Sequence, residues 1–167
     1  PPGFPLFVLA ARIFLAAGLS NFHALQAVNV AAGLFLVPAM VFFYREHRMR
    51  ADVSLIPALL LACMPNVWFF GETAFSDVPS MVLVLIACGL LMRGCRSAGA
   101  YTAGAIVLGI AAGFRPQNLV IGLLPALIST WYQVRDRRLP RILVSAALGA
   151  AIGGISYDAA ARASGGW

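Results

Sequence analysis

Seven apolar runs, separated by short polar turns, make up most of this 167-residue chain. The runs cover residues Phe4–Leu19, Ala24–Phe43, Val53–Phe70, Val78–Met92, Ala98–Phe114, Leu119–Tyr132 and Ile142–Tyr157. Each run approaches the roughly 20 residues that a helix needs to cross the hydrocarbon core of a bilayer. No run alternates strictly between apolar and polar residues, as a barrel strand does. The sequence therefore predicts an all-α fold, a polytopic transmembrane helical bundle.

The composition agrees with a membrane protein and excludes other classes. Hydrophobic residues make up 61% of the chain and charged residues 11%, whereas soluble domains contain about 45–50% and about 25%. So much apolar surface also excludes intrinsic disorder. The formal net charge of +6 comes from arginines that lie mainly in the turns. We therefore expect membrane lipid as a partner and no nucleic acid.

The arginines predict how the helices are oriented. Three clusters follow the second, fourth and sixth runs, and they contain Arg45, Arg48 and Arg50, then Arg93 and Arg96, then Arg135, Arg137, Arg138 and Arg141. Because two runs separate each cluster from the next, all three clusters fall on the same side of the membrane. The positive-inside rule makes that side cytoplasmic. The turns at 20–23, 71–77 and 114–118 and the stretch after Tyr157 then lie on the extracytoplasmic side of the cell membrane.

The first apolar run differs from the others. It has about 16 residues, which is short for a span, and it carries Arg12 in its middle. An unpaired arginine at the bilayer centre costs about 2.5–3.5 kcal/mol on insertion scales, and a helix lying along the outer membrane surface avoids that cost. We therefore predict about six spans and one short interfacial helix, all in a single membrane domain over residues 1–167.

One polar turn on the outer side carries two carboxylates, Glu72 and Asp77, five positions apart. Paired acids at a membrane surface can bind a cation, hold a sugar hydroxyl or act as a base. Helix capping is an alternative for Asp77, since Ser76 or Asp77 suits the N-cap of the next helix. Capping leaves Glu72 unexplained, and we therefore keep both acids as candidate site residues.

A second polar turn on the same side carries Arg115 and Asn118. Arg115 departs from the positive-inside pattern. Its guanidinium can snorkel to lipid headgroups, or it can hold a phosphate in bidentate geometry. An enzyme that uses a lipid-linked phosphate needs such a cation near the outer leaflet. Arg115, with Asn118 beside it, is thus a candidate for binding a donor phosphate.

In their order along the chain, these turns resemble motifs of the GT-C-fold membrane glycosyltransferases, which include bacterial relatives of protein O-mannosyltransferases and the aminoarabinose transferase. Pro1–Leu6 resembles the Pro-Pro-x-x-Pro-type element that leads into the family's juxtamembrane helix. Gly71–Asp77 with Pro79 resembles a Gly-x-x-x-x-x-Asp-x-Pro-like turn. Gly113–Pro116, ahead of a run containing Pro125, resembles a Gly-x-Arg/Lys-Pro loop.

The resemblance implies a function and a role for each candidate residue. The parent enzyme would transfer a sugar from a polyprenyl-phosphate donor to an acceptor hydroxyl or amine at the outer face, with an inverting mechanism. Asp77 would orient the acceptor or a metal, with Glu72 as its partner. Arg115 would neutralise the departing lipid phosphate. Some relatives bind a divalent metal and others do not, so the use of a metal stays open.

The same resemblance implies that the chain is part of a longer protein. The family's principal catalytic aspartate precedes the element matched by Pro1–Leu6, and complete members are several times longer. We therefore expect a domain that is incomplete at both ends and inactive alone.

Two other classes of membrane protein fit the apolar runs. A transporter or channel fragment predicts ionisable groups near the bilayer midplane, and the last six runs contain no Arg, His, Asp or Glu. A non-catalytic membrane scaffold predicts that Glu72 and Asp77 tolerate replacement by alanine.

Overall fold

The structure, a computed structural model, describes residues 4–72 and 75–163 of the chain. The regular structure of these residues is α-helical. The helices in chain order are α1 (Pro5–Ala16), α2 (Asn21–Glu46), α3 (Ala51–Ala62), α4 (Pro65–Glu72), α5 (Asp77–Gly94), α6 (Ala98–Phe114), α7 (Asn118–Arg135) and α8 (Leu139–Ala163). The predicted all-α fold class is confirmed.

Most of the helices follow the predicted apolar runs. α6 has the bounds of its run, and α2, α5, α7 and α8 continue past theirs at both ends. The extensions are expected physically, because hydropathy marks only the part of a helix in the hydrocarbon core. Polar residues can continue the same helix into the headgroup layer, which adds some 10–15 Å to the core thickness of about 30 Å.

The predicted run Val53–Phe70 is the exception, because the structure divides it into two helices. The chain leaves α3 at Cys63 and Met64, and α4 begins at Pro65. A proline has no N–H to donate, and its ring disfavours helical geometry in the residue before it. The prolines inside α2, α3 and α7 do not end their helices; they are Pro38, Pro57 and Pro125.

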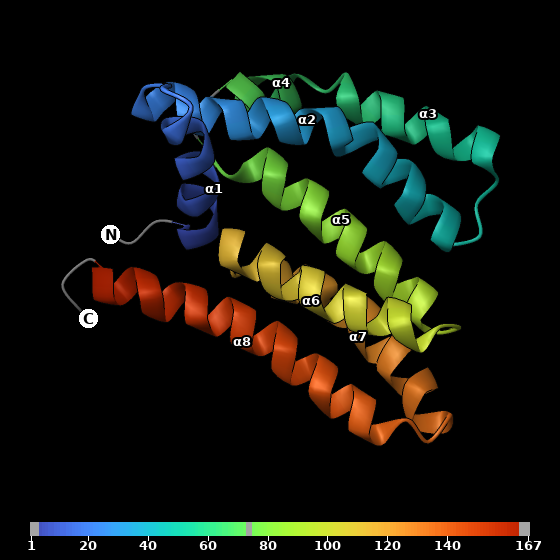
Figure 1. Cartoon of the computed structure of the whole chain (residues 1–167). Coiled ribbons are helices and arrows are strands. Elements are labelled where there is room, and N and C mark those ends of the chain that lie inside the picture. The colour runs from blue at the N-terminus through green and yellow to red at the C-terminus, as the bar shows by residue number, and fades with distance from the viewer. Residues whose placement is uncertain (1–3, 73–74, 164–167) are drawn as a thin grey trace.

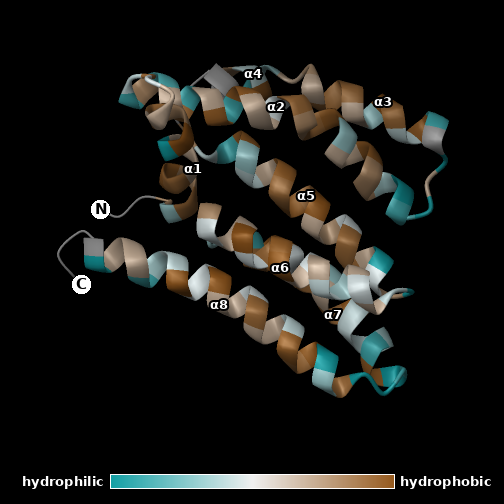
Figure 2. Ribbon diagram, viewed as in Figure 1, coloured by the Kyte–Doolittle hydropathy of each residue, from teal (hydrophilic) through white to brown (hydrophobic). Residues whose placement is uncertain are grey.

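The long helices lie alongside one another, with α5 packed between α2 and α6, and α6 packed on α8 (Figure 1). The α2–α3, α5–α6 and α7–α8 turns, which carry the three arginine clusters, lie at one end of the bundle, at the right of Figure 1. Hydrophilic colour is concentrated at that end in Figure 2. We call it the arginine end, and we call the other the α1 end.

Among the described helices, α2, α5 and α8 are long and apolar enough to cross a membrane by themselves. α1 has 12 residues, so its length of about 18 Å is less than the hydrocarbon thickness of about 30 Å. It lies steeply across the other helices at the α1 end (Figure 1), in contact with α2, α6 and α8. This placement agrees with the predicted interfacial helix.

Large apolar side chains cover the outside of the bundle. Leu34 on α2 is 75% exposed and Val120 on α7 is 74% exposed. A water-soluble monomer rarely carries extended apolar patches of this kind, whereas a bilayer solvates them. The outer surface therefore supports the predicted helical membrane bundle.

Glycines bring α6 and α8 into close contact. A Cβ atom added at Gly109 would collide with the carbonyl group of Gly149, and one added at Gly149 would collide with the carbonyl oxygen of Ala105. Small residues at such positions let two helix backbones touch, which drives association where both helices are already surrounded by apolar lipid.

Replacing Gly109 by valine should separate α6 from α8. We expect Gly109→Val to lower the free energy of unfolding by about 1–3 kcal/mol, the usual cost of overpacking. Gly154→Ala on α8 is the matched control, because a Cβ there meets nothing within 4 Å. Thermal unfolding of the purified protein in detergent measures both, and equal midpoints for the two variants would contradict the proposed contact.

Candidate functional site

The α1 end of the bundle brings two predicted site residues into contact. Nη2 of Arg115 donates to Oδ2 of Asp77 at 2.6 Å and forms a salt bridge. Asp77 is the first residue of α5, and Arg115 caps the C-terminus of α6. The side chains of Arg115 and Asp77 are 21% and 32% exposed. The pair therefore lies at the surface of this end and is partly exposed.

Two further side chains hold the Arg115 guanidinium. Its Nε donates to the hydroxyl oxygen of Ser76 at 2.9 Å, and its Cζ lies 5.0 Å from the centre of the Phe4 ring, within cation–π distance. Ser76 is fully buried. It occupies the predicted N-cap position of α5, but its side chain makes no capping hydrogen bond there. The hydroxyl orients the arginine instead.

Pro116 determines the backbone geometry of Arg115. The residue before a proline is pushed into extended geometry, and Arg115, which precedes Pro116, has φ −153° and ψ 122°. α6 therefore ends at Phe114, and the Arg115 side chain projects from the helix end toward α5. On the other side of the pair, the Asp77 carboxylate lies in the first turn of α5, where the helix dipole favours a negative charge.

Asn118 joins three helices beneath the pair. It is the first residue of α7 and is 2% exposed. Its Nδ2 donates to Oγ of Ser80 on α5 at 2.8 Å and to the carbonyl oxygen of Ala111 on α6 at 2.7 Å, and Ser80 donates back to Oδ1 at 3.1 Å. These contacts give Asn118 a structural role in the site, and a direct contact with a donor stays a prediction.

Glu72 is the last residue of α4. Its side chain lies outside the described residues, as do Thr73, Ala74 and the opening Pro1–Gly3. The predicted partnership of Glu72 with Asp77 therefore stays a prediction. In the described part of the chain, no group of three or more His, Cys, Asp or Glu side chains gathers to hold a metal ion.

The sequence did not indicate two members of the site. They are Ser80, which is hydrogen-bonded to Asn118, and Phe4, whose ring lies against Arg115. Ser76 and Ser80 are four residues apart and therefore share one face of α5, and this polar pair in an otherwise apolar stretch is a usable signal. No comparable pattern marks Phe4, since its contact with Arg115 depends on how α1 crosses the bundle.

The arrangement leaves the guanidinium able to bind an anion. A guanidinium has five N–H groups, and the hydrogen bonds to Ser76 and Asp77 use two of them. The other three N–H groups can donate to phosphate oxygens, and the contacts with Ser76 and Asp77 already hold the guanidinium in position.

Comparison with known proteins yields a glycosyltransferase. In an alignment of 135 positions that covers 77% of the chain, the sequence is 26% identical to the Dol-P-Glc:Glc(2)Man(9)GlcNAc(2)-PP-Dol alpha-1,2-glucosyltransferase of Yarrowia lipolytica. The match covers 26% of that enzyme, so the chain spans about a quarter of its length. No protein-family model and no solved structure matches the chain. The relative supports the predicted resemblance to glycosyltransferases.

Replacing Asn118 by alanine should destabilise the site. Asn118→Ala leaves the Ala111 carbonyl and the Ser80 hydroxyl without their buried partner, and we expect a loss of about 1–3 kcal/mol in the free energy of unfolding. Gln117→Ala is the neighbouring control, since Gln117 is exposed and makes no capping bond. Denaturant unfolding in detergent measures the difference, and an Asn118→Ala protein as stable as the control would refute the structural role.

Proposed function

We propose that these 167 residues form one membrane domain of an integral membrane glycosyltransferase of the GT-C-fold type. In this proposal the enzyme transfers a sugar from a polyprenyl-phosphate donor to an acceptor hydroxyl or amine at the extracytoplasmic face. The similarity to the Yarrowia enzyme carries the proposal, because it extends over 77% of the chain and the name of that enzyme includes Dol-P-Glc. The apolar helices and the Arg115–Asp77 pair support it.

Arg115 is the residue we assign to the donor phosphate. When the bond between the sugar C1 and the phosphate oxygen breaks, negative charge grows on the lipid phosphate. A cation that is already oriented stabilises this charge without reorganising. Ser76, Asp77 and Phe4 supply that orientation for Arg115.

Asp77 orients both the arginine and the acceptor. A carboxylate has about four lone-pair sites, so its bond to Arg115 leaves room for a hydrogen bond from an acceptor hydroxyl. In an inverting displacement the acceptor attacks C1 on the side opposite the leaving phosphate. A base outside these 167 residues takes the acceptor's proton, and Glu72 supports Asp77.

The charge distribution favours a transferase over a transporter or channel. Transport predicts ionisable groups at mid-membrane depth. In the described part of the chain, the interhelical ion pairs lie at helix ends, with Glu46 bound to Arg93 and Arg96 at the arginine end and Asp77 bound to Arg115 at the α1 end.

Loss of either member of the pair should stop sugar transfer by the complete enzyme. We expect Arg115→Ala and Asp77→Asn each to lower the transfer rate by about 10²-fold or more, the usual effect of removing one group that stabilises developing charge. Membranes containing each variant are assayed for glucose transfer from Dol-P-Glc as the first donor tested. Size-exclusion chromatography confirms that each protein is folded.

The matched control for this assay is Arg162→Ala. Arg162 also lies at the α1 end and also pairs with an aspartate, Asp158, but its side chain is 80% exposed. We expect nearly unchanged turnover. Normal turnover in both Arg115→Ala and Asp77→Asn would refute the site, and the non-catalytic scaffold would then be the better description.

The proposed orientation places the α1 end outside the cell. In a protein whose native Cys63, Cys88 and Cys95 are replaced, a cysteine introduced at Thr73 should react with a membrane-impermeant maleimide on intact cells. A cysteine introduced at Ser97 should react only after permeabilisation, because it lies in the α5–α6 turn at the arginine end. The reverse labelling pattern would overturn the topology.

A further inference from the structure

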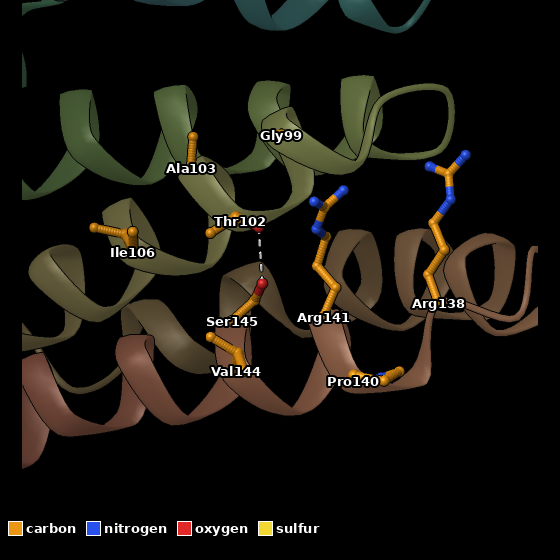
Figure 3. A pocket seen from close by; sticks show the side chains of 9 residues that line it. All are labelled: Gly99, Thr102, Ala103, Ile106, Arg138, Pro140, Arg141, Val144 and Ser145. Carbon is orange, nitrogen blue, oxygen red and sulfur yellow. Dashed lines mark hydrogen bonds between the residues drawn. The ribbon is translucent and has the colours of Figure 1, made fainter.

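A groove at the arginine end lies apart from the proposed transfer site. It is formed by the beginnings of α6 and α8 and has a volume of about 860 Å³ (Figure 3). Its α6 wall includes Thr102, Ala103 and Ile106, and its other wall includes Arg141 and Val144. This size is within the range of about 300–1,000 Å³ that is typical of ligand sites.

The groove forms because α6 and α8 are in contact at one position along their length and are separated at another. The helices meet closely at Gly109 and Gly149, nearer the α1 end. Toward the arginine end, one hydrogen bond of 2.9 Å joins the hydroxyls of Thr102 and Ser145 across the gap (Figure 3). Ser145 is fully buried, and Gly99, which has no side chain, also lines the groove at the start of α6.

Two guanidinium groups stand at the mouth of the groove. The side chains of Arg138 and Arg141 point the same way from the start of α8 (Figure 3). Arg138 is 3.5 Å from the carboxylate of Asp136, and no ion pair involves Arg141 within the described residues. The segment 135–141 holds four arginines and one aspartate, so its net charge is +3. The mouth therefore favours an anion.

The groove walls behind this charged mouth are apolar and face outward. Val144 is 57% exposed, and the neighbouring Leu143 is 70% exposed. In a bilayer this surface meets acyl chains, and the arginine end lies at the level of the headgroups. Guanidinium groups bind phosphate oxygens in bidentate geometry. The combination matches a molecule with one phosphate and a hydrocarbon chain, which is the chemistry of an anionic phospholipid.

We propose that this groove binds an anionic phospholipid of the leaflet at the arginine end. Arg141 and Arg138 hold the lipid phosphate, and one acyl chain lies along Ile106 and Val144. The site is independent of the proposed sugar transfer, because it uses different helix ends and the opposite end of the bundle.

The test compares two pairs of charge removals in the purified full-length protein. Arg138→Gln with Arg141→Gln removes the two arginines of the groove. Arg135→Gln with Arg137→Gln removes the same charge from the same turn, at positions that do not line the groove. Native mass spectrometry measures binding of phosphatidylglycerol and of phosphatidylcholine with the same acyl chains.

We expect the groove pair to weaken phosphatidylglycerol binding by about tenfold or more, as the loss of two direct phosphate contacts predicts. We expect the control pair to change it by less than about threefold, because exposed charges that do not touch the lipid are screened by salt. Equal weakening by both pairs would show diffuse charge attraction and overturn the proposal. Equal affinity of the wild-type protein for phosphatidylcholine would also overturn it.

A further variant tests the shape of the groove without changing its charge. Gly99→Leu places a side chain where the groove is lined by a glycine whose added Cβ would meet only Ser97 Oγ at 4.0 Å, and we expect it to weaken phosphatidylglycerol binding while the protein stays folded. Unchanged binding would contradict the groove. Glycerol 1-phosphate distinguishes a lipid from a soluble phosphate, since its failure to displace the lipid at millimolar concentration supports the proposal and full displacement refutes it.

Discussion

The packing of α6 against its neighbours is the interaction on which the rest of the structure depends. Glycines let this helix approach α5, α8 and α1, since a Cβ at Gly104 would collide with Leu91, one at Gly109 with Gly149, and one at Gly113 with Leu6. α6 ends at Phe114 and Arg115 caps it, so these contacts also determine how far the guanidinium reaches toward α5. The geometry of the candidate site therefore depends on three glycines of α6 that lie outside the site.

Charge–charge contacts fasten α5 at both of its ends. At the arginine end, Glu46 of α2 accepts from Arg93 at 2.6 Å and from Arg96 at 2.7 Å. At the α1 end, Asp77 accepts from Arg115 of α6. Both clusters lie at helix ends, and at the ends of a membrane-spanning helix an ion pair is less costly than at mid-membrane depth.

Sequence alone predicted the parts of the molecule that depend on local chemistry. Apolar runs and arginine turns locate the helices and their common end, and Asp77 and Arg115 are conspicuous as charges on the opposite side. Their contact could not be predicted, because it depends on the register of α5 against α6. The break before Pro65 was not predicted for a related reason. Pro38, Pro57 and Pro125 lie inside helices without ending them, and only packing distinguishes Pro65 from these three prolines.

The distribution of charge between the two ends has an electrical consequence. Nine arginines against Glu46, Asp52 and Asp136 leave the arginine end at +6, whereas Arg12, Arg115 and Arg162 balance Glu72, Asp77 and Asp158 at the α1 end, so the whole formal charge of +6 lies at one end. In the proposed orientation, a membrane potential that is negative inside attracts that end. Inverting the bundle would cost about 2.3 kcal/mol per charge for each 100 mV, or about 14 kcal/mol for six charges. In the proposed orientation, a resting potential would therefore oppose inversion of the domain.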